Sequence, residues 1–138
     1  MVSLLDANLL IALFDASHVH HQRFAVHRAE GWATCSLTQN AAIRVISQPA
    51  YPNRLPVADI ARRLRAAVSA SDHQFWMDDV SLTDASLFDL SQVLTPRHLT
   101  DIYLLGLAAK RDGRLVTLDK GIPAAAVLMA GSNHLLTL

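Results

Sequence analysis

Residues 2–15, VSLLDANLLIALFD, place an acid between two apolar runs. Val2–Leu5 is short and apolar, which is typical of a fully buried strand in a parallel sheet. The second run predicts a helix over Ala7–Phe14, and Asp6 can cap that helix. A second apolar segment that ends at an acid occurs near the C-terminus, so we interpret the fold by working outward from this pattern.

The composition is that of a globular protein and excludes several functional classes. The chain has 138 residues, 51% apolar and 17% charged, with a formal net charge of zero. No overall charge therefore draws it to nucleic acid or to an anionic membrane. A single cysteine, Cys35, excludes an intramolecular disulfide. Neither a membrane-spanning run of about 18 apolar residues nor a secretory signal is present. We expect one cytoplasmic domain over residues 1–138 that makes no contact with a membrane.

Short apolar segments alternate with amphipathic stretches along the chain. We predict strands at Val2–Leu5, Trp32–Cys35, Phe75–Met77, Arg114–Leu118 and His134–Leu138. We predict helices at Ala7–Phe14, around His20–Arg28, from Ser36 or Thr38, at Val57–Ser69, from Thr83 or Asp84 to about Gln92, and at Asp101–Arg111, with Thr100 as its cap and Gly113 as its C′ residue. This alternation predicts an α/β fold, a three-layer α/β/α sandwich around a mostly parallel sheet of about five strands.

Three acids fall where such a fold gathers functional groups. Asp6 and Asp119 each follow a predicted strand, and Asp101 begins a predicted helix. Because the carboxyl ends of parallel strands form one edge, we expect the three carboxylates to converge there. Each acid also has a structural alternative, since Asp is common as a helix cap, in a first helical turn and in tight turns. Three neighbouring carboxylates repel one another, however, and a cation removes that conflict.

A divalent cation held by these acids predicts a specific chemistry. Mg²⁺ prefers oxygen ligands and keeps several waters, so a few carboxylates are enough to hold it. Such an ion polarises a phosphoryl oxygen and lowers the pKa of a bound water. We therefore predict metal-assisted hydrolysis of a phosphodiester, without a covalent enzyme intermediate.

Four segments, LLDANLLIAL, TQNAAIRVIS, HLTDIYLLGLA and RLVTLDKGI, occur in this order and resemble the PIN-domain family. Within that family they are most similar to the VapC-type toxins of bacterial toxin–antitoxin pairs. The resemblance implies an endoribonuclease that depends on Mg²⁺ or Mn²⁺, cuts RNA, is usually a homodimer and is inhibited by a cognate antitoxin. It also implies that the metal-binding acids are Asp6, Asp101 and Asp119, and that the residues near the site are Asn8, Thr117 and Arg44.

One position departs from the family pattern. Gln39 stands where the family commonly has Glu. An amide offers a carbonyl oxygen but no negative charge, so Gln39 is at most a weak or outer ligand. This change leaves open a second hypothesis, a catalytically weak or inactive module that binds RNA or a protein partner. A third hypothesis is a phosphoryl-accepting domain with Asp6, Asp78 or Asp79 as the nucleophile.

Basic and imidazole side chains have less specific interpretations. Arg44 either contacts a phosphate, which its planar guanidinium suits, or is a solvated helix residue. His98, three residues before Asp101, either contacts substrate or is a structural histidine with satisfied hydrogen bonds, and we expect the second. His18, His20 and His21 lack the partner spacing of a zinc site, so we expect surface residues.

Overall fold

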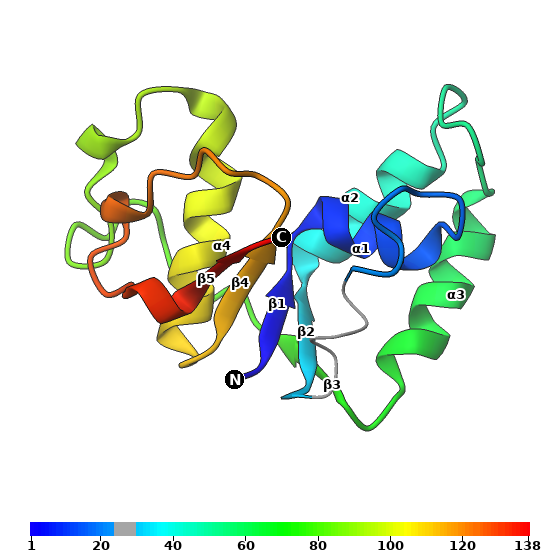
Figure 1. Ribbon diagram of the computed structural model, residues 1–138, viewed down its shortest axis with the longest axis horizontal. Helices are drawn as coiled ribbons and strands as arrows, with labels where there is room; N and C mark the ends of the chain where they lie inside the picture. Colours follow the sequence, from blue (N-terminus) through cyan, green and yellow to red (C-terminus); the bar gives the residue numbers. More distant parts are fainter. Residues whose placement is uncertain (24–29) are drawn as a thin grey trace.

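The computed structural model describes residues 1–23 and 30–138, and its centre is a five-stranded sheet (Figure 1). The strands are β1 Ser3–Leu5, β2 Trp32–Cys35, β3 His73–Trp76, β4 Arg114–Thr117 and β5 Leu135–Thr137. Their order in space is β3-β2-β1-β4-β5, and every neighbouring pair is parallel. The predicted α/β class and parallel sheet are confirmed.

Helices cover both faces of this sheet. The helices are α1 Ala7–Phe14, α2 Ser36–Ile46, α3 Val57–Val68 and α4 Leu99–Lys110. In Figure 1, α1, α2 and α3 lie to one side of the strands and α4 lies to the other, which gives the predicted three layers. The helix predicted around His20–Arg28 falls mostly on residues 24–29, outside the described residues. None of the helices in the described ranges has the length and apolar character needed to cross a bilayer.

Alternation along the central strands divides the apolar core into two. Leu4 of β1 and Leu115 of β4 pack with α4, whereas Leu5 and Val116 pack with the helices on the opposite face. Since strand side chains alternate, the residues that follow Leu5 and Val116 return to the α4 side. Those residues are Asp6 and Thr117, and the pairing of Leu5 with Val116 brings them side by side.

The helix predicted from Thr83 or Asp84 to about Gln92 is wrong. This segment instead forms turns, a β-bridge between Phe88 and Val127, and the short 3₁₀ helix η2, Leu90–Gln92. Its acids explain the difference, since the Asp84 carboxylate accepts hydrogen bonds from both the backbone and the hydroxyl of Ser86. Asp89 does the same with Ser91. Such local side-chain bonds offer the backbone an alternative to the helix.

Both predicted ends of the last helix are shifted. α4 begins at Leu99 after the 3₁₀ helix η3, Pro96–His98, so Thr100 lies inside the first turn and is not the cap. At the other end Asp112, with φ 51°, occupies the left-handed C′ position predicted for Gly113. The N–H groups of Asp112 and Gly113 close a Schellman motif on Ala109 and Ala108.

Gly113 is needed for close packing rather than for its φ angle. A Cβ there would lie 2.5 Å from the Trp76 ring and 2.8 Å from the Val2 carbonyl oxygen. Four strands also differ by one or two residues from the predicted ranges, most clearly β3, which lies at His73–Trp76 instead of Phe75–Met77. Single-sequence patterns place boundaries only to within about 2–4 residues.

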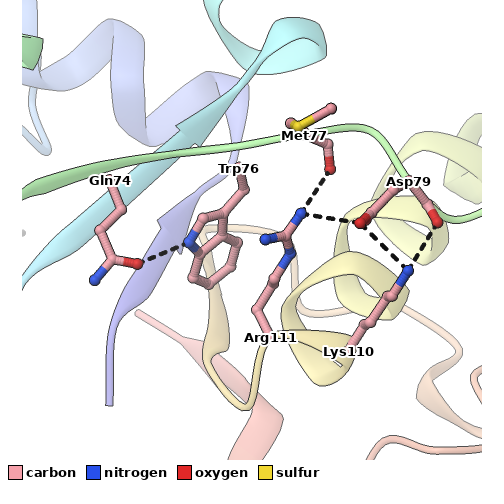
Figure 2. Close-up of polar contacts among 6 residues, drawn as sticks. All are labelled: Gln74, Trp76, Met77, Asp79, Lys110 and Arg111. Atoms are coloured by element: carbon pink, nitrogen blue, oxygen red, sulfur yellow. Dashed lines mark hydrogen bonds and ion pairs between the residues drawn. The ribbon is translucent and has the colours of Figure 1, made fainter.

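The C-terminal end of α4 is joined to the loop after β3 by ion pairs (Figure 2). The Asp79 carboxylate lies 3.3 Å from Lys110 Nζ and 3.1 Å from Arg111 Nη2. Lys110 and Arg111 also donate to the backbone carbonyls of Asp79 and Met77. Each basic group therefore both neutralises the acid and fixes the loop.

Candidate metal and active site

Asp6 is buried at the start of α1 and serves two structural purposes. Its side chain is the N-cap of the helix, with Oδ1 accepting the Leu9 N–H at 2.8 Å. Its other oxygen, Oδ2, accepts the Thr117 hydroxyl. The residue is 4% exposed. Burial, together with the Asp119 charge, raises the pKa of Asp6 although the hydrogen bonds oppose it.

Thr117 links Asp6 to Asp119. Its hydroxyl donates to Asp6 and accepts the backbone N–H of Asp119 at 3.0 Å. Asp119 Oδ1 in turn accepts the Gly121 N–H at 2.8 Å. The turn after β4 is therefore held by its own side chains, as the structural alternative for Asp119 anticipated.

The start of α4 brings Asp101 and His98 to the same place. His98 Nδ1 lies 3.8 Å from Asp101 Oδ2 and 3.7 Å from Asp119 Oδ2. Burial, with the carboxylates of Asp6 and Asp119, raises the pKa of Asp101, and His98 acts against this. The carboxylates of Asp6 and Asp119 oppose ionisation of Asp101, so the acids in this region interact electrostatically.

An open hollow of about 480 Å³ lies over these groups at the carboxyl edge of the sheet. The residues that line the hollow are Asn8, Arg97, Asp101, Leu118 and Asp119. Of the predicted residues near the site, Asn8 lines the hollow and Thr117 lies directly beneath it, bonded to Asp6. The hollow is large enough for a hydrated ion together with a phosphate group.

Gln39 and Arg44, unlike Asn8, do not line the hollow. The Gln39 amide donates to Thr34 Oγ1 at 2.8 Å, and Gln39 does not line the hollow. Arg44 is exposed in the last turn of α2 and does not line it either. Their predicted roles in holding metal or substrate stay predictions.

The expectation for His98 is wrong in one respect. Its side chain is buried, yet Nδ1 has no hydrogen-bond partner within residues 1–23 and 30–138. It is therefore not a histidine with satisfied hydrogen bonds. The i, i+3 spacing to Asp101 at a helix start was the available sequence signal. Arg97, which no sequence pattern singled out, lines the hollow as an exposed cation.

The donor set is suited to a divalent ion. One ligand atom each from His98, Asp101 and Asp119 lie within 4.8 Å of one another. Asp6 is not part of this group. It is buried, accepts the Thr117 hydroxyl, and adds a nearby negative charge. Oxygen donors suit Mg²⁺ and Mn²⁺, and an unpartnered buried nitrogen leaves a lone pair available for such an ion. The residues present therefore fit a metal.

The fold and this acidic edge together define the class. The family model of the PIN domain matches residues 3–128, so the chain belongs to the PIN domain family. The resemblance seen in the four sequence segments is thereby confirmed.

Two ribonucleases of Mycobacterium tuberculosis are among the relatives. The chain is 44% identical over 142 residues to ribonuclease VapC44, with 100% of both chains covered. It is 41% identical over 126 residues to ribonuclease VapC38, with 88% of this chain and 87% of the relative covered.

Two solved structures share the fold. VapBC2 from Rickettsia felis, crystallised with a DNA fragment from its promoter, matches with a TM-score of 0.65 at 12% identity, covering 100% of this chain and 99% of that one. PAE2754 from Pyrobaculum aerophilum matches with a TM-score of 0.53 at 22% identity, covering 94% and 82%. Both likenesses concern the arrangement of the elements.

Proposed function

We propose that this protein is a divalent-metal-dependent endoribonuclease that hydrolyses RNA phosphodiester bonds. One observation carries the proposal: Asp101 and Asp119 meet at the carboxyl edge of the sheet, where their ion pairs in the described residues are with His98 and not with Lys or Arg. The full-length similarity to ribonucleases VapC44 and VapC38 supports the same reaction.

Mg²⁺ or Mn²⁺ would be held by Asp101 and Asp119, with Asp6 adding negative charge from the buried side. When bound, such an ion polarises the scissile phosphate and activates a water. Thr117 positions Asp6 and Asp119 relative to each other through its two hydrogen bonds. Asp101 and Asp119 would thus orient the attacking water, and the buried scaffold limits their movement.

The RNA backbone would be held by basic and amide groups around the hollow. Arg97 lines the hollow, and its guanidinium matches a phosphate oxyanion. Asn8, on the first turn of α1, can donate to a phosphate or ribose oxygen at the same edge. We retain Arg44 as a contact further along the strand, and Gln39 as a weak or outer ligand.

The proposal is tested by cleavage of a structured RNA in Mn²⁺ by the wild type and by Asp6→Asn. Asparagine keeps an oxygen for the Leu9 N–H, so the cap survives while the charge is lost. We expect cleavage that EDTA abolishes in the wild type and a loss of at least about 10-fold in the variant. Equal cleavage by both proteins would contradict the metal mechanism.

A second candidate is the same fold acting as an RNA- or partner-binding module. Gln39 favours it, because its amide is held by Thr34 and brings no charge to the metal. The two candidates separate in one experiment, since a module binds RNA in filter or fluorescence assays without Mn²⁺-dependent cleavage.

A phosphoryl-accepting domain is disfavoured. Asp78 and Asp79 follow β3, which is an edge strand and not a central one. Asp79 is also occupied by Lys110 and Arg111 (Figure 2). The absence of a mass increase after acetyl phosphate treatment would exclude this chemistry.

We further propose that the protein acts in the cytoplasm as the toxin of a type II toxin–antitoxin pair. Residues 1–138 would then act as one PIN-like domain in a homodimer that a cognate antitoxin inhibits. The VapC names of the relatives support this assignment. Co-expression with the small reading frame next to the gene should give a complex whose RNA cleavage is suppressed. Failure of every adjacent frame to bind would contradict it.

A further inference from the structure

We propose that His98 is a direct metal ligand, and that its nitrogen makes the site selective for Mn²⁺-type transition ions over Mg²⁺. This inference rests on the proposed metal-dependent function and specifies the ion of the same site. It assigns a chemical role to a residue that the acid pattern alone did not include.

The first argument is the state of the His98 ring. The residue is 7% exposed, and Nδ1 is buried without a hydrogen-bond partner in the part of the chain that the structure describes. Its separations of 3.8 Å from Asp101 and 3.7 Å from Asp119 exceed hydrogen-bond length. A buried nitrogen left without a hydrogen bond is destabilising, so proteins rarely keep one without a use.

The second argument is the spacing of the donors. Ligand atoms at about 2.0–2.3 Å from one ion lie about 3–4.5 Å from one another. The donor atoms of His98, Asp101 and Asp119 lie within 4.8 Å of one another. The separations from Nδ1 to the two carboxylate oxygens fall inside the expected range.

The third argument is how firmly the fold places this ring. His98 closes the 3₁₀ helix that Pro96 begins, and its backbone N–H donates to the Thr95 carbonyl. Gly121 lies next to the ring, since a Cβ built there would be 3.6 Å from His98 Cε1 and 3.4 Å from Asp119 Oδ1. The imidazole therefore lies beside the turn that carries Asp119, and the fold positions the ring before any ion binds.

The fourth argument is charge. Gln39 brings no negative charge to this site, and its amide donates to Thr34. The imidazole of His98 supplies a donor atom that carries no negative charge, so it adds no repulsion to the neighbouring carboxylates of Asp101 and Asp119. Carboxylates suit Mg²⁺ and Mn²⁺ alike, whereas imidazole suits transition ions, so the mixed set discriminates against Mg²⁺.

Pulsed electron paramagnetic resonance of the Mn²⁺-loaded protein tests the ligand directly. We expect an imidazole ¹⁴N coupling in the wild type that His98→Gln removes. The control is His134→Gln, since His134 is another shielded histidine near an acid, Asp112, and its loss should leave the coupling unchanged. Labelling wild-type histidine with ¹⁵N should convert the coupling to ¹⁵N, which assigns it to histidine without relying on a variant that folds.

Titration calorimetry with Mn²⁺ and with Mg²⁺ tests the selectivity. His98→Gln should weaken Mn²⁺ binding by at least about 10-fold and Mg²⁺ binding by less than about 3-fold. Absence of nitrogen coupling in a wild-type protein whose Mn²⁺ binding Asp101→Asn abolishes would overturn the role of His98 and leave the acidic site intact. Unchanged Mn²⁺ binding in Asp101→Asn would overturn the proposed metal site as a whole.

Discussion

The carboxylates at the two ends of α4 lie in opposite electrostatic environments. At its C-terminal end Asp79 lies between Lys110 and Arg111 (Figure 2). Desolvation there acts to raise the pKa of Asp79, but the bond and charge of Lys110 and the charge of Arg111 outweigh it and lower the pKa. At the N-terminal end, burial and neighbouring acids raise the pKa of Asp101.

This difference separates a structural acid from a candidate functional one. A carboxylate paired with Lys or Arg is already neutralised, so it attracts a cationic ligand only weakly. Carboxylates that are buried together without such a cation are destabilising in the free protein, and a bound divalent ion removes that cost. The fold of the chain, rather than the acids themselves, holds the second arrangement in place.

The largest effect should come from replacing an aspartate with asparagine at each end of α4. We expect Asp101→Asn to lower Mn²⁺-dependent RNA cleavage by at least about 100-fold, because a ligand matters more than the outer partners of a metal site. The matched change Asp79→Asn should leave cleavage unchanged. Initial rates on one labelled RNA measure both. Equal losses of cleavage in the two variants would contradict the distinction between a functional Asp101 and a structural Asp79.

A second test removes the hydroxyl that connects the buried acids. Thr117→Val preserves shape but deprives Asp6 and the Asp119 N–H of a partner. We expect about 1–3 kcal/mol less stability in urea unfolding and roughly 10-fold slower cleavage. The control is Thr83→Val, whose exposed hydroxyl bonds Ser81, with an effect below about 0.5 kcal/mol. Similar losses in both variants would mean that Thr117 does not hold the site.

A third test adds charge near the hollow. Gln39→Glu should raise Mn²⁺ affinity by several-fold, since a site tunes affinity through the number of charged ligands. Asn40→Asp adds the same charge to the next residue of α2, which is exposed, and should not do so. Calorimetry measures the affinities. Equal gains would indicate a general electrostatic effect instead of a ligand.

The smallest effect concerns pH in the metal-free protein. The raised pKa of Asp6 means that the folded state holds this proton more tightly than the unfolded chain. The stability contributed by Asp6 therefore falls as pH rises from its ordinary value of 3.8 through the raised folded pKa. In EDTA, we expect the Tm of the wild type, measured relative to Asp6→Asn, to rise as pH falls from neutral toward the ordinary pKa of 3.8.

Asp79 should give a pH dependence of stability opposite in sign to that of Asp6 in the same Tm measurement. Its lowered pKa gives a contribution that is present above 3.8 and is lost as pH falls through the lowered value. Asp79→Asn should therefore match the wild type in its change between pH 7 and pH 5 and differ only below about pH 4. A flat difference between Asp6→Asn and the wild type from neutral pH down to about pH 4 would contradict the buried-acid interpretation.

Elements with strong periodicity were predicted well, and those governed by local side-chain bonds were not. β1, α1 and β2 follow directly from apolar runs and a capping Asp. The predicted helix over residues 83–92 fails because Asp84 and Asp89 bond their own neighbours. The C′ residue was misassigned to Gly113, because the sequence did not reveal that Trp76 would need the space.

The sequence by itself determined the class of the fold, the family, and the positions of Asp6, Asp101 and Asp119 at the ends or starts of elements, because these depend on local periodicity and capping. Only the tertiary structure decided which groups meet. Among the described residues, it placed His98 Nδ1 beside two acids without a hydrogen bond, joined Gln39 to Thr34 by a hydrogen bond, and placed Arg97 at the hollow. Such relations depend on how separate elements pack in three dimensions, which no local pattern encodes.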